Sequence, residues 1–270
     1  MPEQKFFSQK NLILIKELVK TDFKLRYQGS VLGYLWAIIR PLLLFSILYV
    51  VFDIMLHLGN DIPHYPVYLL TGTVLWSFFL ECTNQGIQSI ILRGDLLRKI
   101  SFSKHIIVIS ATITALINLS INLGVIVIFC LFRGIMPQWS WLLVPFSILE
   151  LYLLSLGIAF LLGAINVKFR DISSIWEVLS QALFYAIPVI YPVTMVAAKS
   201  VLAAKLLLLN PIAQSIQDVR ANLISPETIT TWGFVQSGLL KIVPLLIVIA
   251  VFVFGLTYFN KHSKKFAEEI

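Results

Sequence analysis

Long apolar runs alternate with short polar stretches along this chain. A helix needs about 20 apolar residues to cross the hydrocarbon core of a bilayer, and six runs reach that length. The predicted spans cover residues 31–56, 67–92, 106–132, 141–167, 175–196 and 239–259. The pattern therefore predicts an all-α polytopic membrane protein with six transmembrane helices and both termini on the same side.

A shorter apolar run, VLAAKLLLL at residues 201–209, lies between the fifth and sixth predicted spans. It is too short to cross a bilayer, so we interpret it as an interfacial or re-entrant segment. Asn210 and Pro211 follow this run directly, and Pro188 and Pro192 interrupt the fifth predicted span. These prolines predict broken helices and support a re-entrant structure near the outer face.

The segment before the first span predicts an amphipathic helix. Over residues 12–23 the apolar face carries Leu12, Ile15, Leu18, Val19 and Phe23, and the opposite face carries Lys16, Lys20 and, just beyond, Lys24. Such a helix suits the inner membrane interface, where lysines meet anionic headgroups; the alternative is a basic flank without a helix. Gly29 and Gly33 permit a bend, which divides the chain into an interface segment, residues 1–30, and a transmembrane domain, residues 31–270.

Composition supports the membrane class. Hydrophobic residues make up 58% of the chain and charged residues only 13%, and the mean hydropathy is +0.87, whereas a soluble domain carries about 25% charged residues. The two cysteines, Cys82 and Cys130, lie inside apolar runs and predict no disulfide framework. The first eleven residues are polar and do not resemble a cleavable signal peptide.

The distribution of positive charge predicts the orientation in the membrane. Fifteen Lys and Arg residues fall in the two terminal segments and the loops on their side, and five fall on the other side. The positive-inside rule then places both termini in the cytoplasm. The net charge of +7 is mostly a topology signal, because no soluble basic module is present that would bind nucleic acid.

The motifs of an enzyme are missing from the sequence. No Gly-Lys pair occurs, so there is no Walker A loop for ATP, and no G-x-S-x-G nucleophile motif occurs either. The four histidines have no metal-ligand spacing beside cysteines or carboxylates. The sequence favours transport over catalysis and predicts neither a cofactor nor a metal in this chain.

Four stretches carry a more specific signal. They are RYQGSVLGYLWAIIRPLLLFSILYVVF at residues 26–52, LTGTVLWSFF at 70–79, VKFRDISSIWEVLSQALFYAIPVIYP at 167–192 and LNPIAQSIQDVR at 209–220. In this order and spacing they resemble ABC-2-type polysaccharide export permeases, the membrane subunits that export O-antigen, related lipid-linked glycans and teichoic acids. The resemblance extends from about residue 12 to the C-terminus and is nearest to the O-antigen type.

The resemblance implies a half-transporter without ATPase activity of its own. Such a permease forms a homodimer around a channel, above two separate nucleotide-binding subunits that hold ATP and Mg²⁺. Its substrate would be a polysaccharide on undecaprenyl diphosphate, moved from the cytoplasmic to the outer face of the bacterial inner membrane. Rival interpretations are a teichoic acid exporter, an ABC-2 exporter of a lipid or small hydrophobic molecule, a membrane-embedded glycan-modifying enzyme and a non-transporting scaffold.

The resemblance also places an ATPase-coupling helix in the loop after the second span. The candidate residues are Arg93, Gly94, Asp95, Leu96, Leu97, Arg98, Lys99 and Phe102. Their mixture of charged and apolar side chains suits a small docking element, and the alternative is a solvated positive-inside turn. Leu97 and Phe102, as the most apolar positions, are the predicted contacts with the ATPase.

Arg40 lies nine residues into the first predicted span. An arginine at the centre of a span costs roughly 2.5–3.5 kcal/mol on insertion scales, so Arg40 should face protein or water. Glu81 lies at a similar depth in the second span and is its predicted partner; the alternatives are snorkelling and contact with the diphosphate or glycan. Pro41 should kink the span at this point.

Aromatic side chains within the spans are candidates for lining a glycan channel, because sugar rings stack on aromatic faces. The candidates for channel or substrate contact are Arg26, Tyr27, Tyr34, Trp36, Arg40, Trp76, Phe79, Glu81, Phe184, Tyr185 and Tyr191. For any single aromatic residue, packing or lipid contact is the competing interpretation.

Overall fold

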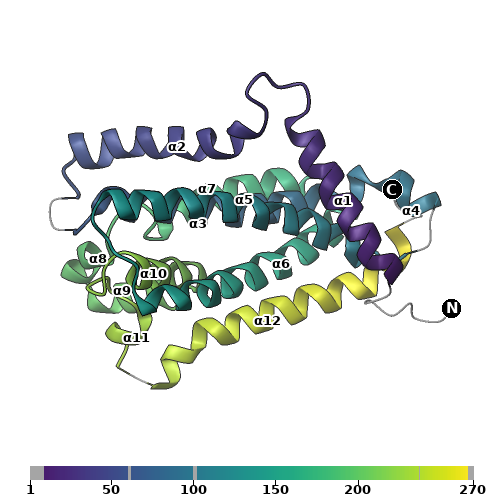
Figure 1. Ribbon diagram of the computed structural model, residues 1–270. Coiled ribbons are helices and arrows are strands. Elements are labelled where there is room, and N and C mark those ends of the chain that lie inside the picture. Colours follow the sequence, from purple (N-terminus) through teal and green to yellow (C-terminus); the bar gives the residue numbers. More distant parts are fainter. Residues whose placement is uncertain (1–8, 60–61, 100–101, 237, 267–270) are drawn as a thin grey trace.

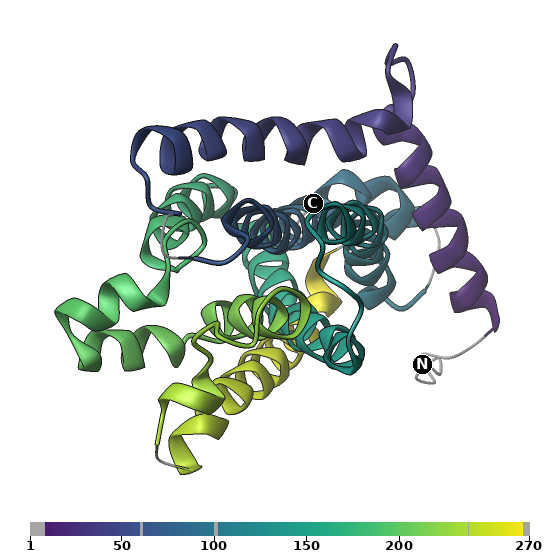
Figure 2. The same cartoon turned by 60° about the vertical axis from the view of Figure 1, so that its left-hand side comes forward.

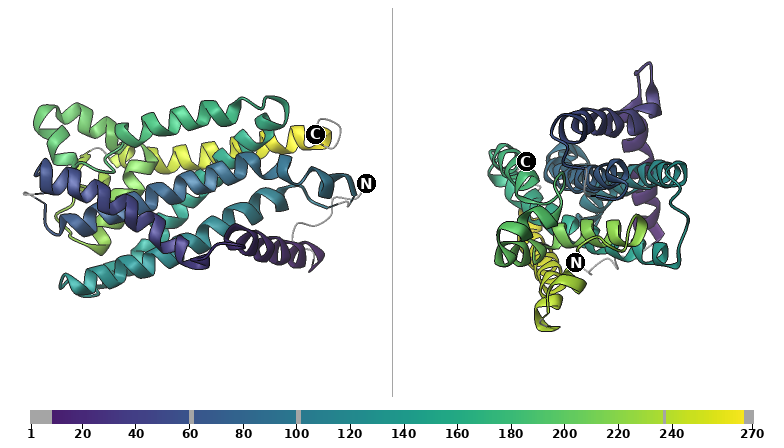
Figure 3. Two further views of the ribbon diagram at one scale, coloured as in Figure 1. Left: turned by 90° about the horizontal axis from the view of Figure 1, so that it is seen from above. Right: turned by 90° about the vertical axis from the view of Figure 1, so that its left-hand side faces the viewer.

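The computed structural model describes residues 9–59, 62–99, 102–236 and 238–266. Within these ranges all regular structure is helical. The long helices run side by side along one axis, with α2 on one side of the bundle, α12 on the opposite side, and α3, α5 and α6 between them (Figures 1 and 3). The short helices α8 to α11 gather at one end, and α1 and α4 lie at the other (Figure 1).

Four helical stretches in the described residues are long and apolar enough to cross a membrane. They are Gly33–Met55, His105–Phe132, Trp139–Lys168 and Gly238–Lys265. The first consists of a 3-10 turn (Gly33–Leu35), α2 (Trp36–Tyr49) and a π-helical turn (Val50–Met55); the others contain α5 (His105–Phe132), α6 (Val144–Lys168) and α12 (Gly238–His262). These stretches correspond to the first, third, fourth and sixth spans predicted from the sequence.

The second predicted span is the central helix of the bundle, α3 (Tyr65–Leu92). It packs against α5, α6 and α2, and most of its side chains are buried. It is not among the four apolar stretches, because threonines and amides interrupt its hydrophobic positions. The buried Thr71 and Thr73, for example, donate hydroxyl hydrogen bonds to backbone carbonyls one turn earlier in the helix. Because its neighbours shield it, this helix tolerates polar side chains that a lipid-facing helix would not.

Small residues bring α6 and α12 close together. A Cβ atom added to Gly255 would lie 2.1 Å from the carbonyl oxygen of Gly157, so only glycine fits at this crossing. Gly86 of α3 likewise faces Ala159 of α6. Close backbone approach through small residues is the usual way in which membrane helices gain packing energy, since lipid supplies no hydrophobic drive between them.

The fifth predicted span, residues 175–196, is a broken helix in the structure, and its crossing of the membrane stays a prediction. Helix α7 (Ile172–Ala186) has 15 residues and ends where Ile187 adopts an extended conformation. Its length is about 22 Å, less than the hydrocarbon thickness of about 30 Å. Pro188 and Pro192 occupy the break before α8 (Val193–Lys199), because a proline cannot donate the helical hydrogen bond.

Three more short helices follow: α9 (Val201–Leu208), α10 (Pro211–Leu223) and α11 (Thr231–Phe234). Asn210 caps α10, since its side-chain oxygen accepts a hydrogen bond from the Ile212 amide at 2.9 Å. The pair Asn210 and Pro211 therefore begins a helix at a favoured cap and first-turn combination. The six-span count and the re-entrant character of this region stay predictions.

The N-terminal segment forms helix α1 (Gln9–Tyr27), which packs against α5. Its placement in the membrane interface stays a prediction. After α1 the chain turns sharply into α2 (Figure 2). Gly29 and Gly33, with φ of 79° and 49°, have the left-handed backbone conformations that this turn requires. The bend that these glycines were predicted to permit is therefore confirmed.

Candidate functional site

A cavity of about 1000 Å³ lies between α2, α3 and α5, next to the end of α1. Four residues predicted as channel or substrate contacts meet here: Arg26, Trp36, Arg40 and Glu81. Its other polar lining residues are Ser30, Ser77, Asn84, Gln85, Asn118 and Asn122. The cavity therefore combines two arginines, one carboxylate, several amides and an indole within a largely apolar bundle.

Glu81 is the centre of the polar network in this cavity. Its Oε1 accepts hydrogen bonds from Asn118 Nδ2 at 2.6 Å and from Gln85 Nε2 at 2.8 Å. The same oxygen pairs with the Arg26 guanidinium. Three donors, one of them charged, thus hold the carboxylate at a fixed position.

Arg40 was predicted to pair with Glu81 because the two residues lie at similar depth in their spans. That prediction is wrong. Arg26 takes that place, because the turn at Gly29 and Gly33 brings the end of α1 against α3. Arg40 lines the same cavity with an exposed side chain. Among the described residues it forms no hydrogen bond or ion pair, so its guanidinium is available to an anion.

Pro41, next to Arg40, is accommodated by a side chain from another helix. Helix α2 continues through Pro41 from Trp36 to Tyr49. Pro41 has no N–H to donate to the Ala37 carbonyl one turn earlier, and Asn122 of α5 supplies the missing donor, with Nδ2 3.1 Å from that oxygen. Asn122 also donates to its own helix, at the Asn118 carbonyl. The contact fixes α2, and with it Arg40, relative to α5.

Sequence reasoning missed the amides that build this network. Asn118 and Asn122 are four residues apart in the third apolar run, so they share one face of α5. Buried amides at helical spacing inside a predicted span are a usable signal of a polar cavity or a helix contact. Gln85, one turn after Glu81 on α3, carries the same signal.

The other predicted channel residues lie outside this cavity. Trp76 and Phe79 of α3 are buried and pack against α7, with ring-centre distances of 5.7 Å from Trp76 to Phe184 and 6.1 Å from Phe79 to Trp176. In this chain they act as packing between helices. A channel-lining role for this aromatic cluster in an assembly stays a prediction.

The tyrosine candidates are scattered around the bundle. Tyr34 stacks on Phe23 at a ring distance of 5.3 Å, and Tyr185 of α7 is 69% exposed. The Tyr191 hydroxyl donates to the Ala186 carbonyl at the end of α7. Tyr27 is the last residue of α1, and its side chain lies outside the described part of the structure.

The loop after α3 contains the short helix α4 (Gly94–Lys99). Leu97 is only 8% exposed and belongs to an apolar cluster with Ile90 and Ile107, and Phe102 packs against the same cluster. Both side chains therefore contact the protein's own core. Asp95, Arg98 and Lys99 are exposed, while Leu96 is half-buried and Gly94 buried.

Arg93 anchors this loop to the rest of the bundle. Its guanidinium pairs with Asp22 of α1 and donates to the Ser110 hydroxyl of α5 at 2.7 Å. The loop is thus a defined surface element with charged side chains outward and apolar side chains inward. Its role as a coupling helix stays a prediction.

Comparison with known proteins gives one family and several named relatives. A family model described as "ABC-2 type transporter" matches residues 13–224. An O-antigen export system permease protein RfbA from Myxococcus xanthus is 30% identical over 208 residues, covering 77% of this chain and 79% of that protein. Two proteins of the same name from Klebsiella pneumoniae are 26% and 27% identical over 256 residues, covering 94% of each chain.

Proposed function

The chain belongs to the ABC-2 transporter family, and from this membership we propose that it is the permease subunit of an ATP-driven O-antigen export system. It is a multi-pass inner-membrane protein. The proposed substrate is a polysaccharide linked to undecaprenyl diphosphate, moved from the cytoplasmic to the outer face. ATP is bound and hydrolysed by a separate partner subunit in this proposal, since the chain has no Walker A motif.

The cavity between α2, α3 and α5 supports this proposal. Arg40, whose guanidinium has no partner among the described residues, suits a diphosphate, and arginine binds phosphate oxygens through paired N–H groups. Amides such as Asn84 and Gln85 suit sugar hydroxyls, and Trp36, 40% exposed, offers an aromatic face. A hydrophobic drug would use none of these polar groups.

The proposed assembly is a homodimer with two ATPase subunits. Helices α2 and α7 carry exposed apolar side chains, among them Ile47, Val178 and Leu179, which a second copy would cover in a dimer. Helix α4 and the end of α12 lie at the same end of the bundle, where the ATPase would bind (Figure 1). With the broken α7 region counted as one crossing, the chain spans the membrane six times in this proposal.

The test is reconstitution of the permease with its ATPase in vesicles. Lipid-linked O-antigen should be transported in an ATP-dependent manner, and transport should stop without the permease. The parallel substrates are a teichoic acid precursor and a hydrophobic drug. ATP-driven movement of only the drug, or glycan chemistry without any ATPase, would overturn the proposal.

Topology gives a direct prediction. In a chain with single cysteines introduced as Ile62→Cys or Thr228→Cys, an impermeant thiol reagent applied outside intact spheroplasts should label the protein. Ser263→Cys should be labelled only after the membrane is opened. The parent is a suitable background because Cys82 and Cys130 are both buried. Reversed accessibility would refute the orientation with both termini in the cytoplasm.

The coupling proposal predicts an effect of charge reversal on α4. Because Arg98 and Lys99 are exposed and Leu97 is internal, the double variant Arg98→Glu with Lys99→Glu tests docking without opening the core. We expect affinity for the ATPase subunit to fall by about tenfold or more, since like charges at an interface cost several kcal/mol. Co-purification and ATPase stimulation measure this effect.

The control for this prediction is Lys199→Glu, which reverses an exposed charge at the opposite end of the bundle. It should leave ATPase binding unchanged. Unchanged binding in the α4 double variant as well would place the ATPase contact elsewhere on the chain.

A further inference from the structure

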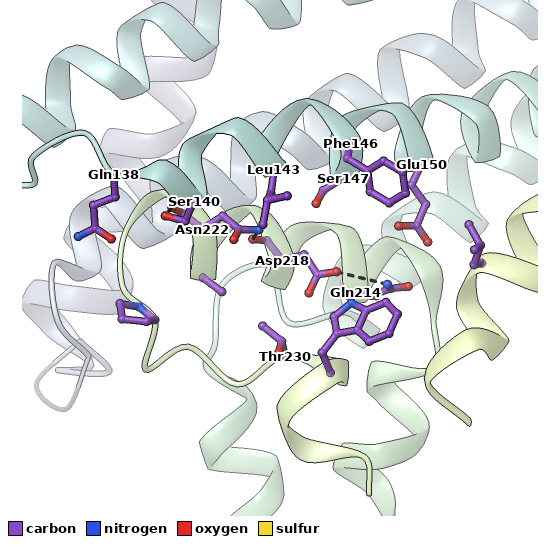
Figure 4. Close-up of a pocket in the computed structure, with 14 residues that line it drawn as sticks. Gln138, Ser140, Leu143, Phe146, Ser147, Glu150, Gln214, Asp218, Asn222 and Thr230 are labelled. Carbon is purple, nitrogen blue, oxygen red and sulfur yellow. Dashed lines mark hydrogen bonds between the residues drawn. The ribbon is translucent and has the colours of Figure 1, made fainter. Parts of the chain in front are cut away.

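A second cavity, of about 560 Å³, lies between α6, α10, α11 and the first half of α12, far along the bundle from α4 (Figures 1 and 4). Two carboxyl side chains line it, Glu150 from α6 and Asp218 from α10. They are 5% and 8% exposed. Among the described residues lining this cavity there is no lysine, arginine or histidine, so no basic side chain balances the two acids.

Two residues that line this cavity carry unpaired acceptors. Glu150 Oε1 and Gln214 Oε1 are buried and have no hydrogen-bond partner among the described residues. Gln214 is 2% exposed and uses its amide nitrogen to donate to Asp218 Oδ2 at 3.3 Å, which leaves its own oxygen free. Figure 4 shows Glu150, Gln214 and Asp218 extending from two helices into the same space. A buried acceptor without a donor is costly, so this arrangement calls for a ligand that donates.

The electrostatics of the cavity favour a cationic donor. Asp218 lies on α10, outside the four candidate spans, and burial raises the pKa of its carboxyl to about 6, although hydrogen bonds from the Gln214 and Trp232 side chains oppose that rise. A positive charge in the cavity would offset this penalty for both carboxylates.

The volume of the cavity and the exposed apolar residues beside it favour an organic cation over a metal ion. The cavity volume is many times the share of one water molecule, about 30 Å³, and it falls in the range of small-molecule sites. No group of three or more His, Cys, Asp or Glu side chains in the described residues could hold a metal. Three apolar residues at the cavity, Leu143, Phe146 and Trp232, are 57%, 64% and 54% exposed, which suits an amphiphile.

We propose that this cavity binds a primary ammonium group, with Glu150, Gln214 and Asp218 as its three acceptors. A primary ammonium has three N–H donors and no acceptor, which matches these side chains one to one. The aromatic rings of Phe146 and Trp232 offer further favourable contact with a cation. The ammonium would come from a phosphatidylethanolamine headgroup or from a soluble amine. This site is separate from the export cavity and does not depend on the proposed glycan.

The test measures lipid binding to the purified full-length chain by native mass spectrometry. Dioleoyl phosphatidylethanolamine is compared with dioleoyl phosphatidylcholine, which has the same phosphate and acyl chains but no N–H donors. We expect about tenfold tighter binding of the ethanolamine lipid, a difference of about 1.4 kcal/mol. Glu150→Gln and Asp218→Asn should each abolish the preference, and Glu227→Gln, at an exposed carboxyl nearby in the chain, should keep it.

A displacement experiment identifies the source of the ammonium group. Displacement of the lipid by free ethanolamine would assign the site to soluble amines, and failure to displace it would assign the site to the lipid headgroup. Equal affinity for the two lipids, or a preference retained in both carboxyl variants, would overturn the proposal. Binding of Ca²⁺ alone that both variants abolish, without a lipid preference, would also overturn it. Should one variant not fold, the lipid comparison on the parent and the other variant still decide the outcome.

Discussion

Arg220→Ala is expected to destabilise the folded chain by about 3 kcal/mol or more, because each buried acceptor left without a donor costs about 1–3 kcal/mol. Arg220 is fully buried. Its guanidinium donates to three backbone carbonyls, those of Pro188 at 2.7 Å, Val189 at 2.6 Å and Tyr68 at 3.0 Å. No other side chain in the described structure donates to these oxygens.

The position of these carbonyls explains the size of the effect. Pro188 and Val189 lie in the break after α7, where the chain has no helical hydrogen bonds to satisfy them. Arg220 also lies over the Tyr68 ring, 3.5 Å from its centre, which adds a cation–π contact with α3. One side chain of α10 therefore connects the break after α7 to the central helix.

Three matched variants separate this role from a general effect of lost charge. Arg220→Lys should be nearly as destabilised, because an ammonium cannot reproduce the planar fork of donors. Gly72→Ala should also destabilise, since its Cβ would lie 2.1 Å from Arg220 Nη2. Lys199→Ala removes an exposed charge at the same end and should have no effect. Stability is measured by SDS-titrated unfolding in mixed micelles. A parent-like unfolding midpoint for Arg220→Ala would contradict the assignment.

The sequence pattern predicted the long apolar helices and the turn before α2, because these depend on local sequence and not on contacts between distant segments. The stretches around α2, α5, α6 and α12 follow from length and apolarity alone, because a helix is the only way for an open chain to satisfy its backbone in hydrocarbon. The turn between α1 and α2 follows from Gly29 and Gly33, which have backbone conformations that other residues rarely adopt.

The parts that the sequence did not predict depend on contacts between distant segments. Pro188 and Pro192 predicted a break within residues 175–196, but not the partner of the carbonyls freed after Ala186. Arg220, more than thirty residues later, donates to them. Leu97 looked like an exposed docking residue because its loop is polar, but the apolar ends of α3 and α5 cover it. Residue type alone does not reveal such pairings.

In the candidate site too, residue type alone did not show which arginine pairs with Glu81. Arg26 and Arg40 both line the cavity with Glu81, and only the turn after α1 decides that Arg26 takes the carboxylate. The free energy of unfolding of Arg40→Ala should therefore lie within about 0.5 kcal/mol of the parent's, as is usual for exposed positions without partners. Export of lipid-linked glycan should fall by about tenfold or more, because loss of a charge-assisted contact with phosphate costs about 1.5–3 kcal/mol.

A double-mutant cycle distinguishes the two arginines. Arg26→Ala and Glu81→Ala should show an interaction energy of about 0.5–1 kcal/mol, since their ion pair is partly exposed. Arg40→Ala and Glu81→Ala should be additive in stability, because Arg40 makes no contact with that carboxylate. Arg133→Ala, an exposed arginine at the end of α5, is the matched control and should keep both stability and export. Parent-like export by Arg40→Ala would contradict the proposal that Arg40 binds the substrate. A loss of stability that Glu81→Ala restores would instead make Arg40, and not Arg26, the partner of Glu81 in the membrane.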